Sequence, residues 1–426
     1  MPKGFLIKLA FFKYDLIWKM IMPFLRLNSR LADGYDQRAL KKDAPSKADI
    51  WIQAASAGEA YLAEAIINKF KYDRPVKVLL TSGTRQGVDI LQRSIDAVSR
   101  GNNIIGRASF FPFDQPAIME KAVKNINPKV MVLLESEMWP GHLLALKKYG
   151  CRTIVINGRM TEKSLKRYLL WKSFWNSIKP DNIYAISEED ADRFATLFGS
   201  KTAGVMPNIK FDRFGCEDTD LSYENPLQKV IPGDTPFIVL GSIRKEEEHF
   251  VEKIILDILK RKPETVIGLF PRHMHRIKYW SDALDHMNIK WTLITNMVGR
   301  AEKGSVILWD SFGELLNAYK YAGAAFVGGS LVPLGGQNFL EALNCGVIPV
   351  TGPFWDNFSW VGSEIVNEGL LRVAENWQGA SDALIEIMEN PPLSREKVIV
   401  EAVKYMKSRQ GGAAFACKVI ENLLQK

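Results

Sequence analysis

Short apolar runs alternate with amphipathic stretches along most of the chain from residue 50. Each run ends at a glycine-rich or polar turn, which is typical of strands followed by helices. We expect strands at 50–55, 76–82, 130–136, 152–157, 182–187, 237–242, 264–270, 290–295, 305–310, 324–329, 347–352 and 370–374. We expect helices at 59–71, 115–125 and 188–198, with Asp114 as the N-cap of the second. This alternation predicts parallel sheets with helices on both faces.

The alternation breaks once, at 206–236, where four prolines and two glycines stand among polar residues. A chain of 426 residues exceeds what one hydrophobic core usually supports. We therefore predict an α/β protein with two Rossmann-like, doubly wound domains facing a central cleft. Its expected parts are an N-terminal segment 1–42, an N-terminal domain 43–210, a linker 211–236, a C-terminal domain 237–400 and a C-terminal helix 401–426. The periodicity of the last part predicts one helical stretch at about 395–425.

The excess positive charge is concentrated at the N-terminus. Residues 1–42 hold nine of the 56 basic residues but three of the 48 acidic ones, and so account for most of the net charge of +8. Nucleic-acid enzymes usually carry a basic stripe along their working face instead. This distribution argues against nucleic acid as a partner.

The same segment is apolar but interrupted by charges. Residues 5–25 are rich in aromatic side chains, and Lys8, Asp15 and Lys19 share one stripe of a helical wheel, with Lys13 roughly opposite. A membrane span has few or no charges, so we predict a monotopic helix in the bilayer interface. The alternative is an amphipathic helix packed on the protein's own core.

The composition excludes collagen, coiled-coil, disordered and polytopic membrane proteins. With 47% hydrophobic and 24% charged residues, the chain is that of an ordinary soluble globular protein. Its four cysteines are scattered without a CxxC pair, which indicates a reducing compartment and neither a disulfide framework nor a structural zinc site. His273 and His275 have no third ligand nearby, so no metal site is expected. The phosphate-binding loop GxxxxGK[ST] and an early GxGxxG are absent from the sequence.

Polar turns after the first-half strands supply candidate catalytic groups. Glu59 follows the first strand in the first turn of a helix, where it could take a proton from a hydroxyl and where the helix dipole would favour its ionised form. Glu135 and Glu137 follow a buried strand, and on an extended chain their side chains would point the same way. Repulsion between the two carboxylates would then raise the pKa of one of them. Lys210, near the linker, could neutralise a phosphate or carboxylate. Each could also be an ordinary solvated residue.

The second half carries the features of a nucleotide site. Arg272 follows a strand and could hold a phosphate, and Phe312, Gly313 and Glu314 precede a helix. Residues 328–338 contain two Gly-Gly pairs directly before another helix, whose Glu341 could accept ribose hydroxyls. Such a loop can also be a tight turn, but its position favours nucleotide binding.

Together these loops resemble those of the 3-deoxy-D-manno-octulosonic acid (Kdo) transferases of lipid A biosynthesis. The matching segments occur in family order across residues 50–358: SAGE (56–59), TSGTRQG (81–87), FPFDQP (111–116), ESEMWP (135–140), NGRMTEKS (157–164), NIKFD (208–212), PRH (271–273), GEL (313–315) and GGSLVPLGGQNFLEAL (328–343). The resemblance implies a GT-B fold, a CMP-Kdo donor, a lipid A precursor (lipid IVA) as acceptor, and a position at the cytoplasmic face of the bacterial inner membrane.

The resemblance also implies roles for individual residues. Glu59 corresponds to the family's proton acceptor, and Glu135 and Lys210 to its transition-state stabilisers. The implied CMP contacts are Pro271, Arg272, Phe312, Gly313, Glu314, Asn338, Phe339, Leu340 and Glu341. The implied reaction is an inverting single displacement that needs no metal or other cofactor.

Three departures from the family pattern bear on this interpretation. Gln337 replaces the histidine of the family's GGHN, and Met274 replaces the proline of PRHP. The segment NIKFD begins with Asn208-Ile209, where the family's segment is similar to SLKFD. The implied catalytic residues are retained, so an active enzyme is expected. The alternatives are another GT-B glycosyltransferase that uses a UDP-sugar, and a membrane-bound nucleotide-binding protein without turnover.

Overall fold

The computed structural model describes residues 3–99, 103–213, 225–233 and 235–425. It divides into two compact units, residues 1–213 with 409–426, and residues 214–408, which we call the first and second domains. Of the expected linker 211–236, residues 214–224 and 234 lie outside the described residues, as does Cys216. The other three cysteines are buried free thiols.

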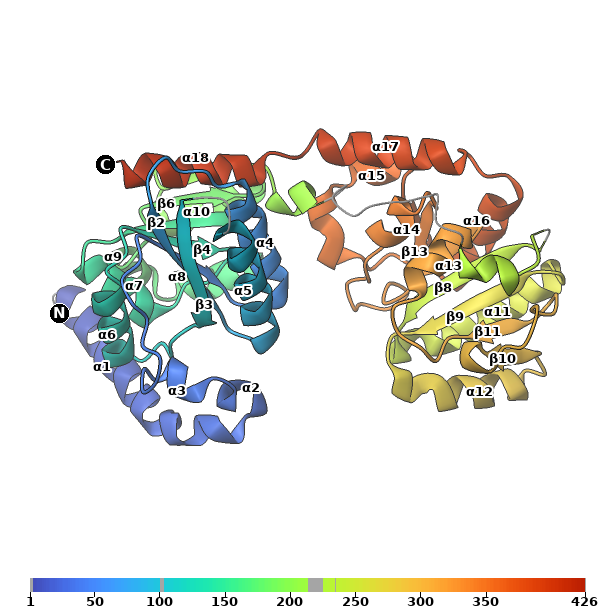
Figure 1. Cartoon of the computed structure of the whole chain (residues 1–426), viewed down its shortest axis with the longest axis horizontal. Coiled ribbons are helices and arrows are strands. Elements are labelled where there is room, and N and C mark those ends of the chain that lie inside the picture. The colour runs from blue at the N-terminus through green and yellow to red at the C-terminus, as the bar shows by residue number, and fades with distance from the viewer. Residues whose placement is uncertain (1–2, 100–102, 214–224, 234, 426) are drawn as a thin grey trace. The chain divides into compact units, whose positions relative to one another are not determined.

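The first domain is built on a parallel sheet in the order β3-β2-β1-β4-β5-β6-β7 (Figure 1). Its strands are β1 (Ile50–Ala54), β2 (Val76–Ser82), β3 (Ile104–Phe110), β4 (Val130–Leu134), β5 (Arg152–Gly158), β6 (Asn182–Ala185) and β7 (Ala203–Val205). Its helices include α4 (Ala57–Lys69), α5 (Arg85–Ser99), α6 (Pro116–Ile126), α7 (Pro140–Lys148), α8 (Glu162–Leu169), α9 (Lys172–Ser177) and α10 (Glu188–Phe198). The predicted parallel architecture is confirmed, although β3 and β7 are additional to the predicted strands.

Alternating residues of the strands form two separate cores. Ile50 and Ile52 of β1 face the apolar side chains of α4 and α5, whereas Trp51 faces α6, α7 and α10. Helices therefore cover both faces, as expected for a buried parallel sheet.

The second domain repeats this plan with the order β10-β11-β9-β8-β12-β13-β14, again entirely parallel. Its strands are β8 (Phe237–Ile243), β9 (Val266–Pro271), β10 (Trp291–Leu293), β11 (Val306–Leu308), β12 (Ala324–Val327), β13 (Pro349–Thr351) and β14 (Arg372–Val373). Its helices are α11 (Glu248–Arg261), α12 (Ile277–His286), α13 (Leu315–Tyr321), α14 (Leu340–Asn344), α15 (Glu364–Asn367), α16 (Trp377–Glu389) and α17 (Arg395–Lys407).

The C-terminal stretch is two helices rather than the predicted continuous one. A break at 408–411, where Gly411 has a φ of 116°, separates α17 from α18 (Gly412–Leu424). The last helix belongs to the first domain, where Ala416 and Ile420 join the core beside α4 (Figure 1). The chain therefore ends on the domain in which it began.

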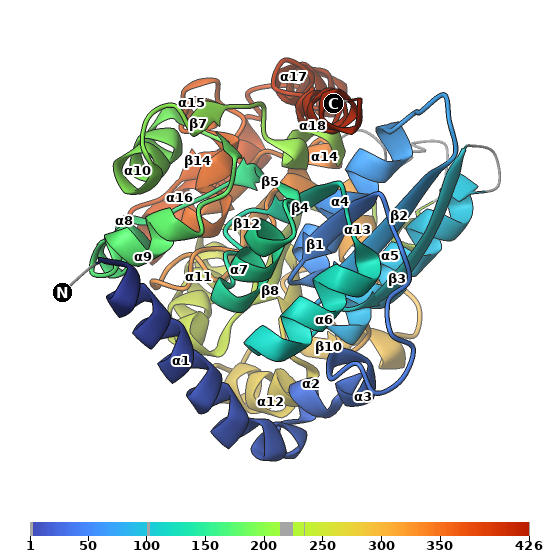
Figure 2. The same ribbon diagram turned by 90° about the vertical axis from the view of Figure 1, so that its left-hand side faces the viewer.

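The N-terminal segment forms α1 (Lys3–Ile21), η1 (Met22–Leu27), α2 (Ser29–Ala32) and α3 (Tyr35–Arg38). Figure 2 shows α1 on the outside of the first domain, where it contacts α9. Phe11 packs on Phe174 with ring centroids 4.8 Å apart, and Trp18 approaches Phe113 at 6.2 Å. Within the described residues, no helix combines the length and the apolar character needed to cross a membrane.

Asp212 fastens α18 to the first domain. Its carboxylate accepts hydrogen bonds from the backbone N–H groups of Gly411 and Ala413, both at 2.7 Å, at the start of that helix. We expect Asp212→Ala to lower the free energy of unfolding of the first domain by about 1–2 kcal/mol, as for other lost helix caps. Calorimetry measures this free energy of unfolding. As a control, Asp192→Ala on the exposed side of α10 should change the free energy of unfolding by less than about 0.5 kcal/mol.

Candidate active site

The candidate catalytic residues lie where the strand order of the first sheet reverses. β1 has β2 on one side and β4 on the other, and Glu59 follows β1 while Glu135 follows β4. Connections leave such a point in opposite directions, so a crevice forms at the carboxyl ends of the strands, where open α/β sheets bind ligands. The topology therefore brings together two carboxylates that are far apart in sequence.

Glu59 is held by the first turn of α4. Its Oε2 accepts the backbone N–H of Ala55 at 2.8 Å, while the N-cap Ser56 accepts the N–H of Glu59 through Oγ at 3.3 Å. Burial, aided by the nearby charges of Glu137 and Glu135, raises the pKa of Glu59 to about 8. The helix dipole, expected to favour the ionised form, does not determine the pKa of Glu59, because the loss of water on burial raises it. The result is a carboxylate poised near neutral pH, as a general base requires.

Glu135 and Lys210 form an ion pair beside this carboxylate. Lys210 Nζ lies 2.8 Å from Glu135 Oε1, and both side chains are largely buried. Glu135 itself has a φ of 54°, a left-handed conformation that is uncommon for a residue with a side chain. Such backbone conformations persist where the surroundings impose them, and they cluster at functional sites.

Two buried asparagines position the Lys210 backbone. Asn157 Oδ1 accepts the N–H of Ile209 at 2.9 Å, and Asn208 Oδ1 accepts the N–H of Lys210 at 3.0 Å. They come from the end of β5 and from the start of NIKFD. Asn208, which departs from the family pattern, thus supports the backbone of Lys210 directly.

Glu137 adds a third carboxylate to this edge. Burial, together with the charge of Glu135, raises the pKa of Glu137, although Trp139 Nε1 donates to its Oε2 at 2.6 Å. The raised pKa of Glu137 agrees with the prediction, but the predicted geometry, an extended chain with both glutamates on one side, is wrong. β4 ends at Leu134 and the left-handed Glu135 turns the chain, so the two glutamates do not sit on an extended strand.

The candidate CMP residues lie at the carboxyl edge of the second sheet. Pro271 ends β9, Arg272 follows it with an exposed side chain, and Phe312 is 77% exposed in the turn after β11. Gly313 has a φ of 89°, and Glu314 accepts the indole N–H of Trp309 at 2.7 Å. These loops present an aromatic face, a cation and a carboxylate along one edge.

The glycine-rich loop leads from β12 into α14. Asn338 Nδ2 donates to Glu341 Oε1 at 2.8 Å, so two of the candidate contacts are linked. Phe339 is fully buried against Trp355, and Leu340 is 8% exposed. A ligand would therefore meet residues 339 and 340 through their backbone rather than their side chains.

A buried glutamate that the sequence analysis did not identify holds this loop. Glu247 is fully buried, and its carboxylate accepts the backbone N–H groups of Arg244, Gly329, Ser330 and Leu331. A Cβ at Gly328 would lie 2.6 Å from Glu247 Oε1, so glycine is needed there. Sequence offers the run Glu246-Glu247-Glu248 after β8, but nothing in that run shows which carboxylate turns inward.

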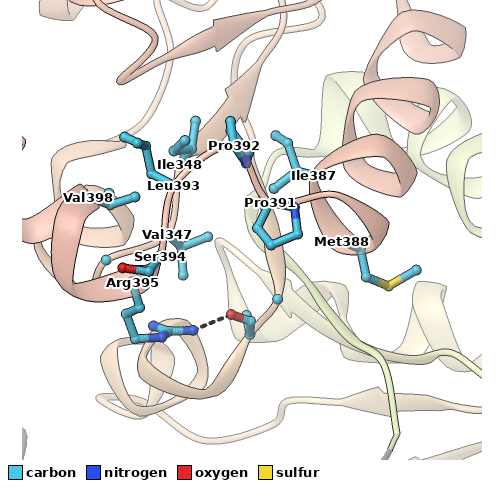
Figure 3. A pocket seen from close by; sticks show the side chains of 13 residues that line it. Val347, Ile348, Ile387, Met388, Pro391, Pro392, Leu393, Ser394, Arg395 and Val398 are labelled. Atoms are coloured by element: carbon cyan, nitrogen blue, oxygen red, sulfur yellow. Dashed lines mark hydrogen bonds between the residues drawn. The ribbon is translucent and has the colours of Figure 1, made fainter.

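A hollow of the second domain lies at the opposite edge of the sheet. Figure 3 shows a cavity of about 210 Å³ lined by Val347, Ile348 and Leu393, at the amino ends of β12 and β13. The guanidinium of Arg395 donates to the carbonyl of Ala322 on its wall. Among the described residues, no group of three or more His, Cys, Asp or Glu side chains could hold a metal ion.

Glu247→Gln tests the support of the glycine-rich loop. The amide has one acceptor oxygen in place of two, and its NH₂ group would face N–H donors. We expect the free energy of unfolding of the second domain to fall by about 2–3 kcal/mol, measured by calorimetry. The neighbouring Glu246 has a side chain that is 49% exposed. Glu246→Gln should therefore change the free energy of unfolding by less than about 0.5 kcal/mol. Equal effects of the two variants would contradict the assignment.

Known proteins resemble the chain in sequence and fold. Residues 26–213 match the family model described as 3-Deoxy-D-manno-octulosonic-acid transferase (kdotransferase). The 3-deoxy-D-manno-octulosonic acid transferase of Haemophilus influenzae is 27% identical over 393 residues, or 89% of this chain and 90% of that protein. A bifunctional glycosyltransferase/methyltransferase of Fusobacterium nucleatum is 28% identical over 400 residues, or 90% of this chain but 60% of that protein's length.

A crystal structure of a glycosyltransferase from Rickettsia africae shares the fold. The TM-score is 0.56 at 11% sequence identity, and the match covers 90% of this chain and all of the other. The two parallel α/β sheets described above are those of the GT-B glycosyltransferases. Residues 26–213 thus carry a Kdo transferase family domain, and the chain resembles Kdo transferases over most of its length.

Proposed function

We propose that the protein transfers Kdo from CMP-Kdo to lipid IVA, a lipid A precursor, with inversion at the anomeric carbon. The observation that carries this proposal is the convergence of Glu59, Glu135 and Lys210 at the reversal point of the first sheet. The first domain then binds the acceptor and the second domain binds the donor. These roles are part of the proposal.

The chemistry follows from the acid–base state of Glu59. As the acceptor hydroxyl attacks the anomeric carbon of Kdo, Glu59 takes the hydroxyl proton, the new C–O bond forms, and the C–O bond to CMP breaks. Attack from the face opposite the leaving group inverts the configuration. Lys210, held by Glu135, offers a positive charge to the Kdo carboxylate.

The second domain supplies groups suited to CMP. Arg272 is exposed at the end of β9 and can pair with the phosphate, which carries the charge as CMP departs. The Glu341 carboxylate can accept ribose hydroxyls, and the exposed Phe312 ring can stack on a base. None of these steps requires a metal or another cofactor.

The N-terminal segment supports a membrane-bound acceptor. Its outer side exposes a set of large apolar side chains, which we call the apolar strip: Leu9, Phe12, Leu16, Ile17, Met20, Ile21, Phe24 and Leu27. Lys13 and Lys19 are also exposed on α1. An apolar strip flanked by cations suits a monotopic position at an anionic bilayer, on the cytoplasmic face of the bacterial inner membrane.

Removing the proposed base tests the chemistry. Glu59→Gln keeps the size of the side chain but cannot accept the proton, so we expect transfer to fall by about 10²–10⁴-fold. Binding of CMP, measured by calorimetry, should stay within a factor of two because the donor loops belong to the other domain. Unchanged turnover would refute the role of Glu59. Loss of turnover with CMP still bound would exclude the non-catalytic nucleotide-binding alternative.

The raised pKa of Glu59 predicts a pH profile. A base must be deprotonated, so kcat/KM should rise with pH, level off above the Glu59 pKa of about 8, and be about 100-fold below its plateau at pH 6. Glu137→Gln removes a neighbouring negative charge and should move this limb to lower pH. A limb near 4.5, the ordinary value, would show that the site does not raise the pKa.

The apolar strip predicts vesicle binding. We expect the double variant Phe12→Ser, Phe24→Ser to lose most of the protein's co-sedimentation with anionic phospholipid vesicles, because two side chains that are 67% and 66% exposed lose their apolar area. Val298→Ser, which changes a 93% exposed residue of the second domain, should bind as before. Equal binding by all three proteins would place the membrane contact elsewhere.

Competition between nucleotides separates the donor alternatives. CMP should displace bound CMP-Kdo, whereas UDP should not. Preferential displacement by UDP would instead support a GT-B enzyme that uses a UDP-sugar.

A further inference from the structure

A buried aspartate of the FPFDQP segment joins α1 to the helix that follows the Glu135 turn. Asp114 is 3% exposed. Its Oδ1 accepts the N–H of His142 at 2.7 Å, and its Oδ2 accepts the N–H of Gly141 at 2.8 Å and the hydroxyl of Tyr14 at 2.7 Å. The prediction that Asp114 caps α6 is wrong: the N-cap of α6 is Gln115, and Asp114 instead caps α7.

We propose that Asp114 is a positioning residue for the Glu135–Trp139 turn and that Tyr14 ties this support to α1. This inference rests on the proposed function, because it gives Glu135 a role in transfer. It adds two residues, one in α1 and one before α6, that do not touch the reacting atoms.

The turn is short and is fixed at both ends. At its start, the N–H of Glu135 donates to the carbonyl of Ile156 at 3.0 Å. At its end, α7 begins at Pro140, and the first N–H groups of a helix have no partner within the helix. Asp114 satisfies two of them. The left-handed backbone of Glu135 is thus confined between a strand contact and a capped helix.

The contact between Asp114 and α7 is close and leaves little freedom. A Cβ at position 141 would lie 2.5 Å from the carbonyl oxygen of Asp114, so glycine permits this approach. The next residue, His142, is fully buried against the rings of Trp51 and Phe111, at 4.7 and 5.1 Å between centroids. The first turn of α7 is therefore anchored both to the core and to Asp114. A shift of Asp114 would be transmitted to the turn that bears Glu135.

Tyr14 lies on α1 where its hydroxyl reaches Asp114 of the first domain. It is flanked by Trp18, which packs edge-on at 6.4 Å between ring centroids. Burial and the neighbouring Asp114 carboxylate raise the pKa of the Tyr14 hydroxyl, so it remains a donor at neutral pH. The helix that carries the apolar strip thus also donates, through Tyr14, to the cap of the turn that bears Glu135.

A double-mutant cycle with Glu135 tests this role. Asp114→Asn has one acceptor oxygen for three donors, and we expect kcat to fall by at least ~10-fold, in line with the cost of small misplacements. KM for CMP-Kdo should stay within a factor of two. In the Glu135→Gln background, Asp114→Asn should cause no further loss, because residues that act through one another are not additive. A general structural role would reduce kcat by the same factor in both backgrounds.

A second variant keeps the test decisive if Asp114→Asn does not fold. Tyr14→Phe removes one hydroxyl and retains the ring, and we expect about a 3-fold loss of kcat, again absent in the Glu135→Gln background. The matched control is Tyr149→Phe, whose hydroxyl contacts Glu120 Oε1 at 3.4 Å on the surface, and it should leave kcat unchanged.

The outcomes separate the inference from the proposed function. Wild-type kcat in both Asp114→Asn and Tyr14→Phe, or losses of equal factor in both backgrounds, would overturn the positioning role. Wild-type kcat in Glu135→Gln would instead overturn the assignment of Glu135 on which the inference rests.

Discussion

The reversal of strand order beside the first strand of each sheet is the constraint on which this structure depends. In the first domain β2 and β4 flank β1, and in the second β9 and β12 flank β8, so neighbouring connections leave in opposite directions. Room remains at the carboxyl edge, and the candidate catalytic and CMP-binding groups lie there. Glu59 and Glu135 meet at this point in the first domain, and the Arg244–Glu247 turn meets the glycine-rich loop in the second.

Both sites use buried carboxylates that accept backbone N–H groups. Glu59, Asp114 and Glu247 each lose water on folding, and in each case burial raises the pKa while hydrogen bonds from amides lower it. The three carboxylates differ in what they hold. Glu247 and Asp114 fix the backbone of a loop and of a helix start, whereas Glu59 lies at the strand edge, where the proposed reaction needs a proton acceptor.

The sequence was most informative where one short segment determines the outcome. The apolar runs before Glu135 and Arg272 predicted β4 and β9, and the turn after the first strand predicted Glu59 in the first turn of a helix. β3 was missed because Gly106 and Arg107 interrupt its apolar pattern. Asp114 was assigned to the wrong helix because its partners are 27 and 28 residues away, a distance that local capping rules do not reach.

Side-chain burial was equally hard to predict. A repeat of apolar residues could not show which side of α1 packs on Phe113 and which carries the apolar strip. Nor could it show that burial would outweigh the helix dipole at Glu59. These outcomes depend on neighbours brought in by the tertiary fold. The family resemblance supplied the candidate site residues, and the structure shows how each of them is buried and bonded.

The most direct test of the account is the mass and anomeric configuration of lipid IVA after incubation with the purified protein and CMP-Kdo generated in situ. We predict that the acceptor gains one or more Kdo units, with the configuration inverted relative to the donor. An unchanged acceptor in the presence of tightly bound CMP would contradict the proposed acceptor. Retained configuration would contradict a single displacement with Glu59 as base.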